Sequence, residues 1–263
     1  MFKADFRKRN QIEAFFDITI CLFLRDFKSR FGAYRYGLLW MIVEPTVHVV
    51  TFIFILSRFQ SGEQLELVPF FVVSGVIPFF LFRSITKSVL GSLKGNKTMF
   101  SYPLIQPIHL AFSKVVYESF IYTFSFVAIY TVVHFFLWEN RHEANFTLLM
   151  IIFFLMTLTS GALGLTFMVI REFHPSIEKI VNISFRPMYF LSGAFYSLSV
   201  IPHEYLFIFS YNPIVHMIEL TRFAVTGEQP IVADMTYLIE VTLLLLIVSL
   251  YLYIRNKDKL KSL

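Results

Sequence analysis

The sequence contains one cysteine, Cys21, and its seven histidines are scattered along the chain. A single thiol excludes an intrachain disulfide and leaves no thiol cluster for a metal, so we expect Cys21 to serve in packing. No Ser-His-Asp, paired-carboxylate or metal-ligand spacing stands out among the other residues. We therefore predict no catalytic residues, no metal site and no cofactor bound by this chain.

Charged residues are also scarce, at 16% of the 263 residues, whereas hydrophobic residues make up 56% and aromatic residues 18%. Such a chain is too apolar for a soluble domain of ordinary composition and is predicted to be an integral membrane protein. Its first residues carry charges on both sides of a short apolar patch and lack a small-residue cleavage site. We therefore expect that no secretory signal is removed.

The hydrophobic runs predict an all-α protein with six transmembrane helices. These helices are expected at about 37–57, 68–90, 109–138, 146–170, 178–197 and 235–254. They would form a single transmembrane domain over 1–263, with a cytoplasmic arm and interfacial helix at 1–36, a core at 37–254 and a tail at 255–263. In the fourth run, Ser160 and Gly164 have the spacing of small residues that allows helix backbones to approach, within or between subunits.

The positive charges indicate which connections face the cytoplasm. The amino-terminal arm holds eight Lys and Arg residues, the 83–114 connection five, the 171–186 connection three and the tail after Ile254 four. Because such residues near spans stay inside, both termini are predicted to be cytoplasmic, which leaves Arg58, Arg141 and Arg222 outside. This placement explains the net charge of +5 without nucleic acid, for which the chain has no basic-aromatic motif.

Residues 11–31 are predicted to form an amphipathic helix that lies in the membrane interface. The apolar residues at helical spacing are Ile12, Phe15, Phe16, Thr19, Leu22, Phe23 and Phe27. The alternative is a short additional span over 14–24. That run is too short to cross a bilayer and includes the charged Asp17.

Residues 182–222 combine two apolar runs with the helix breakers Pro187, Gly193, Pro202 and Pro213. The second run, 205–217, is too short to cross a membrane. We therefore predict two re-entrant half-helices near the outer leaflet, between the fifth and sixth spans. The alternative of two full crossings, giving seven spans, would put the basic tail outside.

The 91–108 connection alternates polar with bulky apolar residues and is predicted to contain a short amphipathic helix ended by Pro103. Its glycines and Lys97 resemble pieces of a phosphate-binding loop, but Asn96 separates Gly95 from Lys97 and no soluble strand precedes them. We expect a docking surface for a separate cytoplasmic protein instead. Its candidate coupling residues are Asn96, Lys97, Met99, Phe100, Tyr102 and Gln106.

Four stretches together resemble a known family. They are RDFKSRFGAYRYGLLWMIVEPTVH at 25–48, SGVIPFFLF at 74–82, RPMYFLSGAFY at 186–196 and YNPIVHMIELTR at 211–222. In this order they are similar to the membrane subunit of capsular polysaccharide ABC exporters, within the type-2 ABC export family that also moves O-antigen and teichoic acid. The similarity covers nearly the whole chain.

The resemblance implies a homodimer in a Gram-negative inner membrane, with two copies of a cytoplasmic ATPase that uses ATP and Mg. It also implies a central path for a lipid-linked polysaccharide, a periplasmic adaptor, an outer-membrane export protein and a coupling role for 91–108. An O-antigen or teichoic acid exporter is the alternative within the family. A glycan-modifying membrane acyltransferase, or a passive channel or scaffold, is the alternative from another class.

Four ionisable residues are candidates for the substrate path or its surroundings. Glu44 is an intramembrane carboxylate with His48 one turn on, and either a transport role or a structural ion pair fits it. Arg83 and Lys87, with Arg186, either anchor their helices to headgroups or receive the anionic groups of the substrate.

Aromatic side chains are the other candidates, because flat apolar rings bind sugar faces without requiring one particular sugar sequence. Most of the 33 phenylalanines are expected to face lipid or the core. The rings expected to line a sugar path are Trp40, Tyr189, Phe190, Phe195 and Tyr196.

Overall fold

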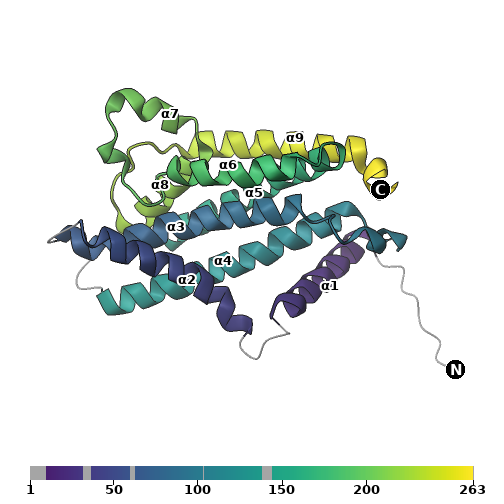
Figure 1. The fold of residues 1–263 in the computed structure, drawn as a ribbon, viewed down its shortest axis with the longest axis horizontal. Helices are drawn as coiled ribbons and strands as arrows, with labels where there is room; N and C mark the ends of the chain where they lie inside the picture. Colours follow the sequence, from purple (N-terminus) through teal and green to yellow (C-terminus); the bar gives the residue numbers. More distant parts are fainter. Residues whose placement is uncertain (1–9, 32–36, 60–62, 103, 138–143, 263) are drawn as a thin grey trace.

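The computed structural model describes residues 10–31, 37–59, 63–102, 104–137 and 144–262, and all regular structure in these ranges is helical (Figure 1). The α-helices are α1 (Gln11–Phe31), α2 (Gly37–Leu56), α3 (Glu63–Leu90), α4 (Pro107–Leu137), α5 (Phe146–Phe173), α6 (Ile177–Phe190), α7 (Leu206–Ser210), α8 (Pro213–Thr226) and α9 (Met235–Ser262). Three short 3-10 helices are η1 (Lys97–Ser101), η2 (Leu198–Val200) and η3 (His203–Tyr205).

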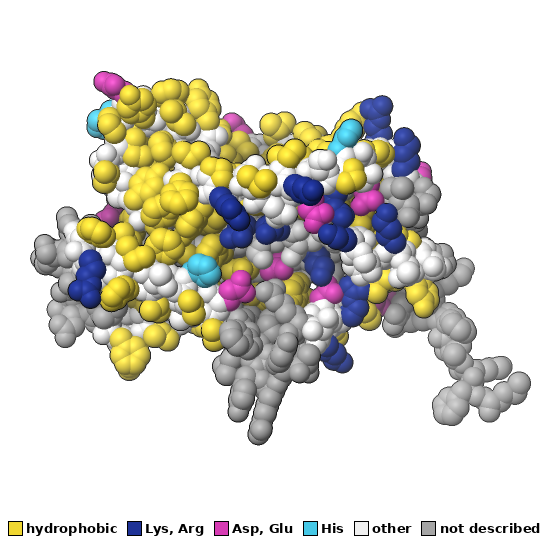
Figure 2. Space-filling model, viewed as in Figure 1, with side chains coloured by type: hydrophobic (Ala, Val, Ile, Leu, Met, Phe, Trp, Pro, Cys, Tyr) yellow, Lys and Arg dark blue, Asp and Glu magenta, His cyan; other side chains and the backbone are white. Residues whose placement is uncertain are grey.

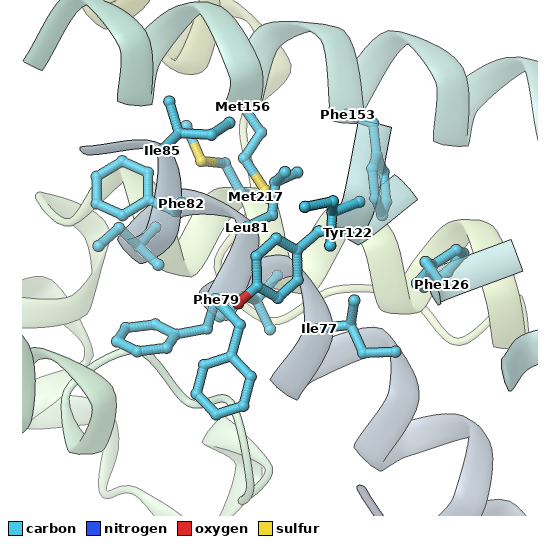
Figure 3. Close-up of a cluster of buried hydrophobic side chains, with 14 of the residues drawn as sticks. Ile77, Phe79, Leu81, Phe82, Ile85, Tyr122, Phe126, Phe153, Met156 and Met217 are labelled. Carbon is cyan, nitrogen blue, oxygen red and sulfur yellow. The ribbon is translucent and has the colours of Figure 1, made fainter. Parts of the chain in front are cut away.

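Helix α3 forms the centre of the molecule and packs against α2, α4, α5 and α8. Its residues from Val68 to Phe82 are almost all apolar and buried, which is the pattern of a helix segment surrounded by others. Figure 3 shows its side chains meeting residues of the surrounding helices, including Tyr122 of α4, Met156 of α5 and Met217 of α8. The fold therefore has one core, built around the second predicted span.

The small residues of α5 allow the close approach that their spacing predicts. A methyl group added at Gly164 would lie 2.8 Å from Cβ of Val89 and 3.0 Å from the carbonyl oxygen of Thr86, both on α3. The Thr86 hydroxyl also donates a hydrogen bond to the carbonyl of Ser160, at 3.3 Å. The contact between Ser160, Gly164 and α3 is therefore packing within one subunit.

Within the described residues, four helices are long and apolar enough to cross a membrane: Leu67–Leu90, Pro107–Phe136, Phe146–Phe173 and Met235–Leu260. Each overlaps one of the predicted spans, and α2 begins where the first span was expected and ends one residue earlier. The described apolar part of α2, Ile42–Leu56, is shorter than these four. The chain is therefore a multi-pass membrane protein, and the regular structure of its described residues is all helical.

The fifth predicted span, 178–197, is not one continuous helix, because α6 already ends at Phe190. Pro187 lacks an amide hydrogen for the helix ladder, and Gly193 adopts a positive φ of 66° that ordinary residues avoid. After this turn the chain forms only η2, η3, α7 and α8 before α9. The predicted breaking of 182–222 into short helical pieces is confirmed.

Cysteines placed singly at Glu204 and Glu228 are expected to react from outside the cell with a membrane-impermeant thiol reagent, in a Cys21→Ser background. Both side chains are exposed and lie on either side of α8, so the half-helix model places them on one side of the membrane. A cysteine at the exposed Lys94 is the control and should react only after permeabilisation. If the cysteines at positions 204 and 228 react from opposite sides of the membrane, the result would support seven spans.

Candidate functional site

A charged cavity of about 340 Å³ lies between α2, α3 and α4. Its lining residues are Glu44, His48, Phe80, Arg83, Ser84, Lys87, Ser88, Glu118 and Tyr122. Figure 2 shows that most Lys, Arg, Asp and Glu side chains on the visible face gather in a band from the centre to the right, whereas the left is mainly hydrophobic. The structure therefore brings together the predicted Glu44, Arg83 and Lys87. Arg186 is exposed on α6 and is not among the lining residues.

The lining residues of α2 are one helical turn apart. The His48 ring nitrogen Nδ1 lies 2.9 Å from the carbonyl oxygen of Glu44. Since a carbonyl only accepts hydrogen bonds, Nδ1 must donate this one. The rings of His48 and Phe80 of α3 also meet in a T-shaped arrangement, with centroids 4.8 Å apart. Glu44 and His48 thus form one acceptor-bearing wall of the charged cavity.

Glu118 of α4 is a cavity residue that sequence reasoning missed. Only 3% of this side chain is exposed, and its carboxylate accepts hydrogen bonds from the hydroxyls of Ser84 at 2.8 Å and Ser88 at 2.5 Å. An acidic residue inside the predicted 109–138 span was the available signal, and it is the same signal that singled out Glu44. Because of Glu118, the cavity contains two carboxylates as well as the two cations Arg83 and Lys87.

Four of the predicted path aromatics lie in one cluster. The Tyr189 and Phe195 rings are 5.3 Å apart, and the Phe195 ring is also 5.3 Å from those of Phe190 and Tyr196. The structure adds Phe52 of α2 and Phe79 and Phe80 of α3 to this aromatic cluster. The side chain of the fifth predicted ring, Trp40, lies outside the described residues.

Phe80 joins the charged cavity to the aromatic cluster. Its ring lines the cavity and stacks on Tyr189 at 6.0 Å with an interplanar angle of 20°. The Arg83 guanidinium lies 6.0 Å from the centroid of the same ring. A ligand in the cavity would therefore have the Phe80 ring beside its charged groups.

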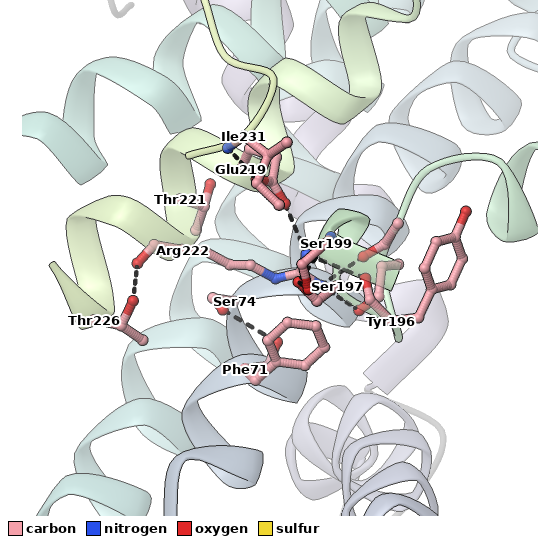
Figure 4. A network of polar contacts seen from close by, with 12 residues as sticks. Phe71, Ser74, Tyr196, Ser197, Ser199, Glu219, Thr221, Arg222, Thr226 and Ile231 are labelled. Atoms are coloured by element: carbon pink, nitrogen blue, oxygen red, sulfur yellow. Dashed lines mark hydrogen bonds and ion pairs between the residues drawn. The ribbon is translucent and has the colours of Figure 1, made fainter. Parts of the chain in front are cut away.

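Arg222, which the distribution of charges leaves outside the cytoplasmic group of cations, lies in the core of the protein. The side chain is only 7% exposed and forms an ion pair with Glu219 at 3.0 Å, also within α8 (Figure 4). Its guanidinium stacks over Phe71 of α3 at 3.7 Å. Glu219 in turn accepts a hydrogen bond from the backbone N–H of Ile231 at 3.2 Å. A buried charge needs such partners, and the sequence pattern alone did not show them.

The Arg222 network holds the turn that carries the aromatic cluster. Its Nη2 donates to the carbonyls of Gly193 at 2.5 Å and Ala194 at 3.1 Å, and Nη1 lies 3.5 Å from the carbonyl of Tyr196. On the other side, a methyl group added at Gly75 of α3 would overlap the Ala194 carbonyl oxygen. Arg222 and Gly75 together position the turn directly after α6.

The predicted coupling segment is tied to α1 and α5. The Arg25 guanidinium of α1 donates to the Asn96 side-chain oxygen at 3.1 Å and contacts the Met99 sulfur at 2.8 Å. Lys97 forms an ion pair with Glu172 of α5 at 3.4 Å. The segment is thus connected to two other helices, as an element that transmits motion requires.

Exposure divides the coupling residues into two groups. Met99 and Phe100 are half-buried and pack against the core, so they support the segment from inside. Tyr102 is 67% exposed, its neighbour Leu104 is 72% exposed, and Lys97 and Gln106 are exposed as well. Only this second group, together with part of Asn96, offers surface to another protein.

Comparison with known proteins identifies the family. A model described as ABC-2 type transporter matches residues 19–225. The chain belongs to the ABC-2 type transporter family. The match includes the charged cavity, the aromatic cluster, the Arg222 network and the coupling segment, so all four are parts of an ABC-2 transporter. The resemblance found in the sequence motifs is confirmed.

Three curated relatives cover most of this ABC-2 transporter chain. The polysialic acid transport protein KpsM of Escherichia coli is 34% identical to this chain over 237 residues. The aligned region covers 88% of this chain and 90% of KpsM. The capsule polysaccharide export inner-membrane protein BexB of Haemophilus influenzae is 23% identical over 90% of both chains. The O-antigen export system permease protein RfbA of Klebsiella pneumoniae is 22% identical over 77% of this chain and 78% of its own.

Proposed function

We propose that this chain is the transmembrane subunit of an ATP-driven exporter that moves lipid-linked capsular polysaccharide across the bacterial inner membrane. The observation that carries the proposal is the contact between the charged cavity and the aromatic cluster, which meet at the Phe80 ring. The similarity to KpsM and BexB supports the capsule as the substrate class. The similarity to the O-antigen permease RfbA is lower and covers less of the chain. An O-antigen exporter is therefore the less favoured alternative.

The proposed assembly is a homodimer of six-span subunits with both termini in the cytoplasm. The overlap of α2, α3, α4, α5 and α9 with five of the predicted spans and the distribution of Lys and Arg support this topology, in which α6 and the turn after it would form the fifth span. Two copies of a separate ATPase would bind at Tyr102 and the neighbouring coupling residues and would hydrolyse ATP with Mg. A periplasmic adaptor and an outer-membrane polysaccharide export protein would continue the path beyond the inner membrane.

The proposed mechanism divides substrate handling between charge and aromatic rings. Arg83 and Lys87 in the charged cavity, with Arg186 of α6, would bind the anionic end of the substrate near the inner leaflet. Tyr189, Phe190, Phe195 and Tyr196, with Trp40, would then contact successive sugar faces. Rings that make no sequence-specific hydrogen bonds would let the polymer slide.

Replacing Arg83, Lys87 or Arg186 with a neutral residue is expected to reduce export. Each variant is expressed in a strain from which the wild-type gene for this chain has been deleted. Each charge-assisted contact is worth about 1.5–3 kcal/mol, so loss of one should weaken substrate binding roughly 10- to 100-fold. Arg186→Lys should impair export and Arg186→Gln should impair it more, because lysine keeps the charge but loses the planar fork. The measurement is surface polysaccharide per assembled transporter, with polymer retained inside the cell as the complementary reading.

The control for these variants is Arg58→Gln, which removes an exposed arginine just after α2. If all single and paired neutral variants of Arg83, Lys87 and Arg186 export at the wild-type rate, these cations are membrane anchors. If the wild-type gene itself does not restore surface polysaccharide, the proposed substrate class is wrong.

A further inference from the structure

Five charged side chains of alternating sign form a continuous chain where α5 meets α6. In order along this charge chain they are Lys97, Glu172, Arg171, Glu178 and Lys94. The Glu172 carboxylate lies 3.4 Å from Lys97 Nζ and 3.4 Å from an Arg171 guanidinium nitrogen. The Glu178 carboxylate lies 2.9 Å from the Arg171 guanidinium and 3.4 Å from Lys94 Nζ. Both lysines belong to the coupling segment, so the charge chain attaches this segment at two points.

Each carboxylate of the charge chain divides its two oxygens between two elements. Glu172 presents Oε1 to Arg171 of α5 and Oε2 to Lys97 of η1. Glu178 of α6 presents Oε2 to Arg171 and Oε1 to Lys94. Arg171 therefore links the two carboxylates, and each carboxylate reaches one lysine. Isolated surface ion pairs hold their partners weakly, whereas several charges in one network hold them more firmly.

The two carboxylates differ in burial. The Glu172 side chain is only 8% exposed, and a buried carboxylate needs its partners, so we expect Glu172 to keep the coupling segment attached to the end of α5. The Glu178 side chain is 30% exposed and its partner Lys94 is 68% exposed. The contact with α6 is thus the more adaptable of the two, and neutralising Glu178 leaves no buried charge behind.

Within one subunit, helix α6 is packed along a narrow face. Of its 14 residues, all of which the structure describes, Val181 and Phe185 are buried. The side chains of Ile180, Ile183 and Phe190 are 57%, 66% and 61% exposed. Few buried apolar contacts lower the free-energy cost of moving an element. Helix α6 can therefore tilt more readily than the buried centre of α3.

The charge chain acts at one end of α6, and the aromatic cluster lies at the other. Glu178 is in the first turn of α6, directly after the short corner 174–176, and Phe190 is its last residue. From position 178 to position 190 an α-helix rises about 18 Å, at about 1.5 Å per residue. A small displacement of Glu178 about this corner therefore becomes a larger displacement at Tyr189 and Phe190.

We propose that Glu172 and Glu178 are positioning residues that transmit movement of the coupling segment to α6. Glu172 keeps the segment attached to the end of α5, which serves as the pivot. Glu178 passes the displacement of Lys94 to the first turn of α6, and the aromatic cluster at its far end moves in response. This inference rests on the proposed function and adds the route by which ATP hydrolysis reaches the substrate path.

Glu178→Gln is expected to reduce export per ATP hydrolysed while the ATPase stays bound and active. Surface polysaccharide per assembled transporter is measured in the deletion strain, and ATP hydrolysis is measured on the purified complex in lipid nanodiscs. Residues on a coupling route change the coupling by about two- to thirtyfold, which is the loss expected for Glu178→Gln and for Glu172→Gln. Glu13→Gln, at an exposed carboxylate in the first turn of α1, is the matched control and should export normally.

A covalent link should replace the ion pair between the coupling segment and α6. Lys94→Cys with Glu178→Cys, in a Cys21→Ser background, removes both charges and should lower export per ATP. The proposed topology exposes both thiols on inside-out membrane vesicles, where a short bifunctional thiol reagent can join them. The measurement is entry of the strain's own lipid-linked polymer into the vesicles per ATP hydrolysed. The reagent should raise this ratio for the double variant and for neither single cysteine variant.

Several results would overturn the transmission route. One is normal export per ATP in Glu178→Gln and in any assembled Glu172→Gln. Another is a loss of export in proportion to the bound ATPase, because docking and not transmission has then failed. Failure of the two thiols to be joined, or no gain once they are joined, would show that the contact only supports the fold. If the wild-type gene itself does not restore surface polysaccharide, the proposed function has failed, a result seen before any variant is compared.

Discussion

Arg222→Gln is expected to lower the stability of the subunit by about 3–5 kcal/mol, the usual result of removing one partner of a buried ion pair. The substitution leaves Glu219 charged in the core and removes the donors for the carbonyls of Gly193 and Ala194. It also removes the cation stacked on Phe71. The measurement is the melting temperature of the protein in detergent. It is obtained from the amount of protein that still elutes as a single species after heating.

The ion pair can be removed as a whole to check this explanation. Glu219→Leu combined with Arg222→Met leaves no unpaired charge, so the double variant should be more stable than Arg222→Gln. Arg58→Gln is the control at an exposed arginine that contacts only the Phe54 ring face in the described structure, at 4.9 Å. A decrease of less than about 2 °C for Arg222→Gln, which corresponds to under about 1 kcal/mol, would contradict the prediction.

Tyr102→Ala combined with Leu104→Ala is expected to abolish export while leaving the subunit in the membrane. These two side chains are 67% and 72% exposed, so their loss opens no cavity in the core. Large apolar residues at the centre of an interface each cost about 2 kcal/mol or more when truncated, which weakens binding at least about 30-fold. Co-purification of the ATPase and surface polysaccharide should fall together, while the amount of the chain in the membrane stays unchanged.

The matched control for the docking surface is Tyr205→Ala, which removes another exposed aromatic ring, 54% exposed, in η3. Met99→Ala with Phe100→Ala should behave differently from both, because these side chains pack against the core and their loss should lower stability. Normal ATPase binding and export in the Tyr102 and Leu104 double variant would show that the ATPase binds elsewhere.

The sequence by itself determined where the helices lie, because a transmembrane helix needs a long apolar run and that run is local in the chain. The expected spans overlap α2, α3, α4, α5 and α9, and the prolines and Gly193 correctly indicated that 182–222 is broken into short pieces. The end of α6 at Phe190 was not predicted. It depends on the turn at Gly193, whose carbonyl is held by Arg222 from another helix.

Only the tertiary structure decided which polar residues act together. Glu118 lies 30 and 34 residues from its partners Ser88 and Ser84, and hydropathy carries no record of such pairings. For the same reason the sequence did not show that Arg222 is buried, although its contacts with Glu219 and the turn after α6 place it in the core. Hydrophobic runs can be recognised from consecutive residues in the sequence. The partners that stabilise a buried charge come from distant parts of the chain, and only packing brings them together.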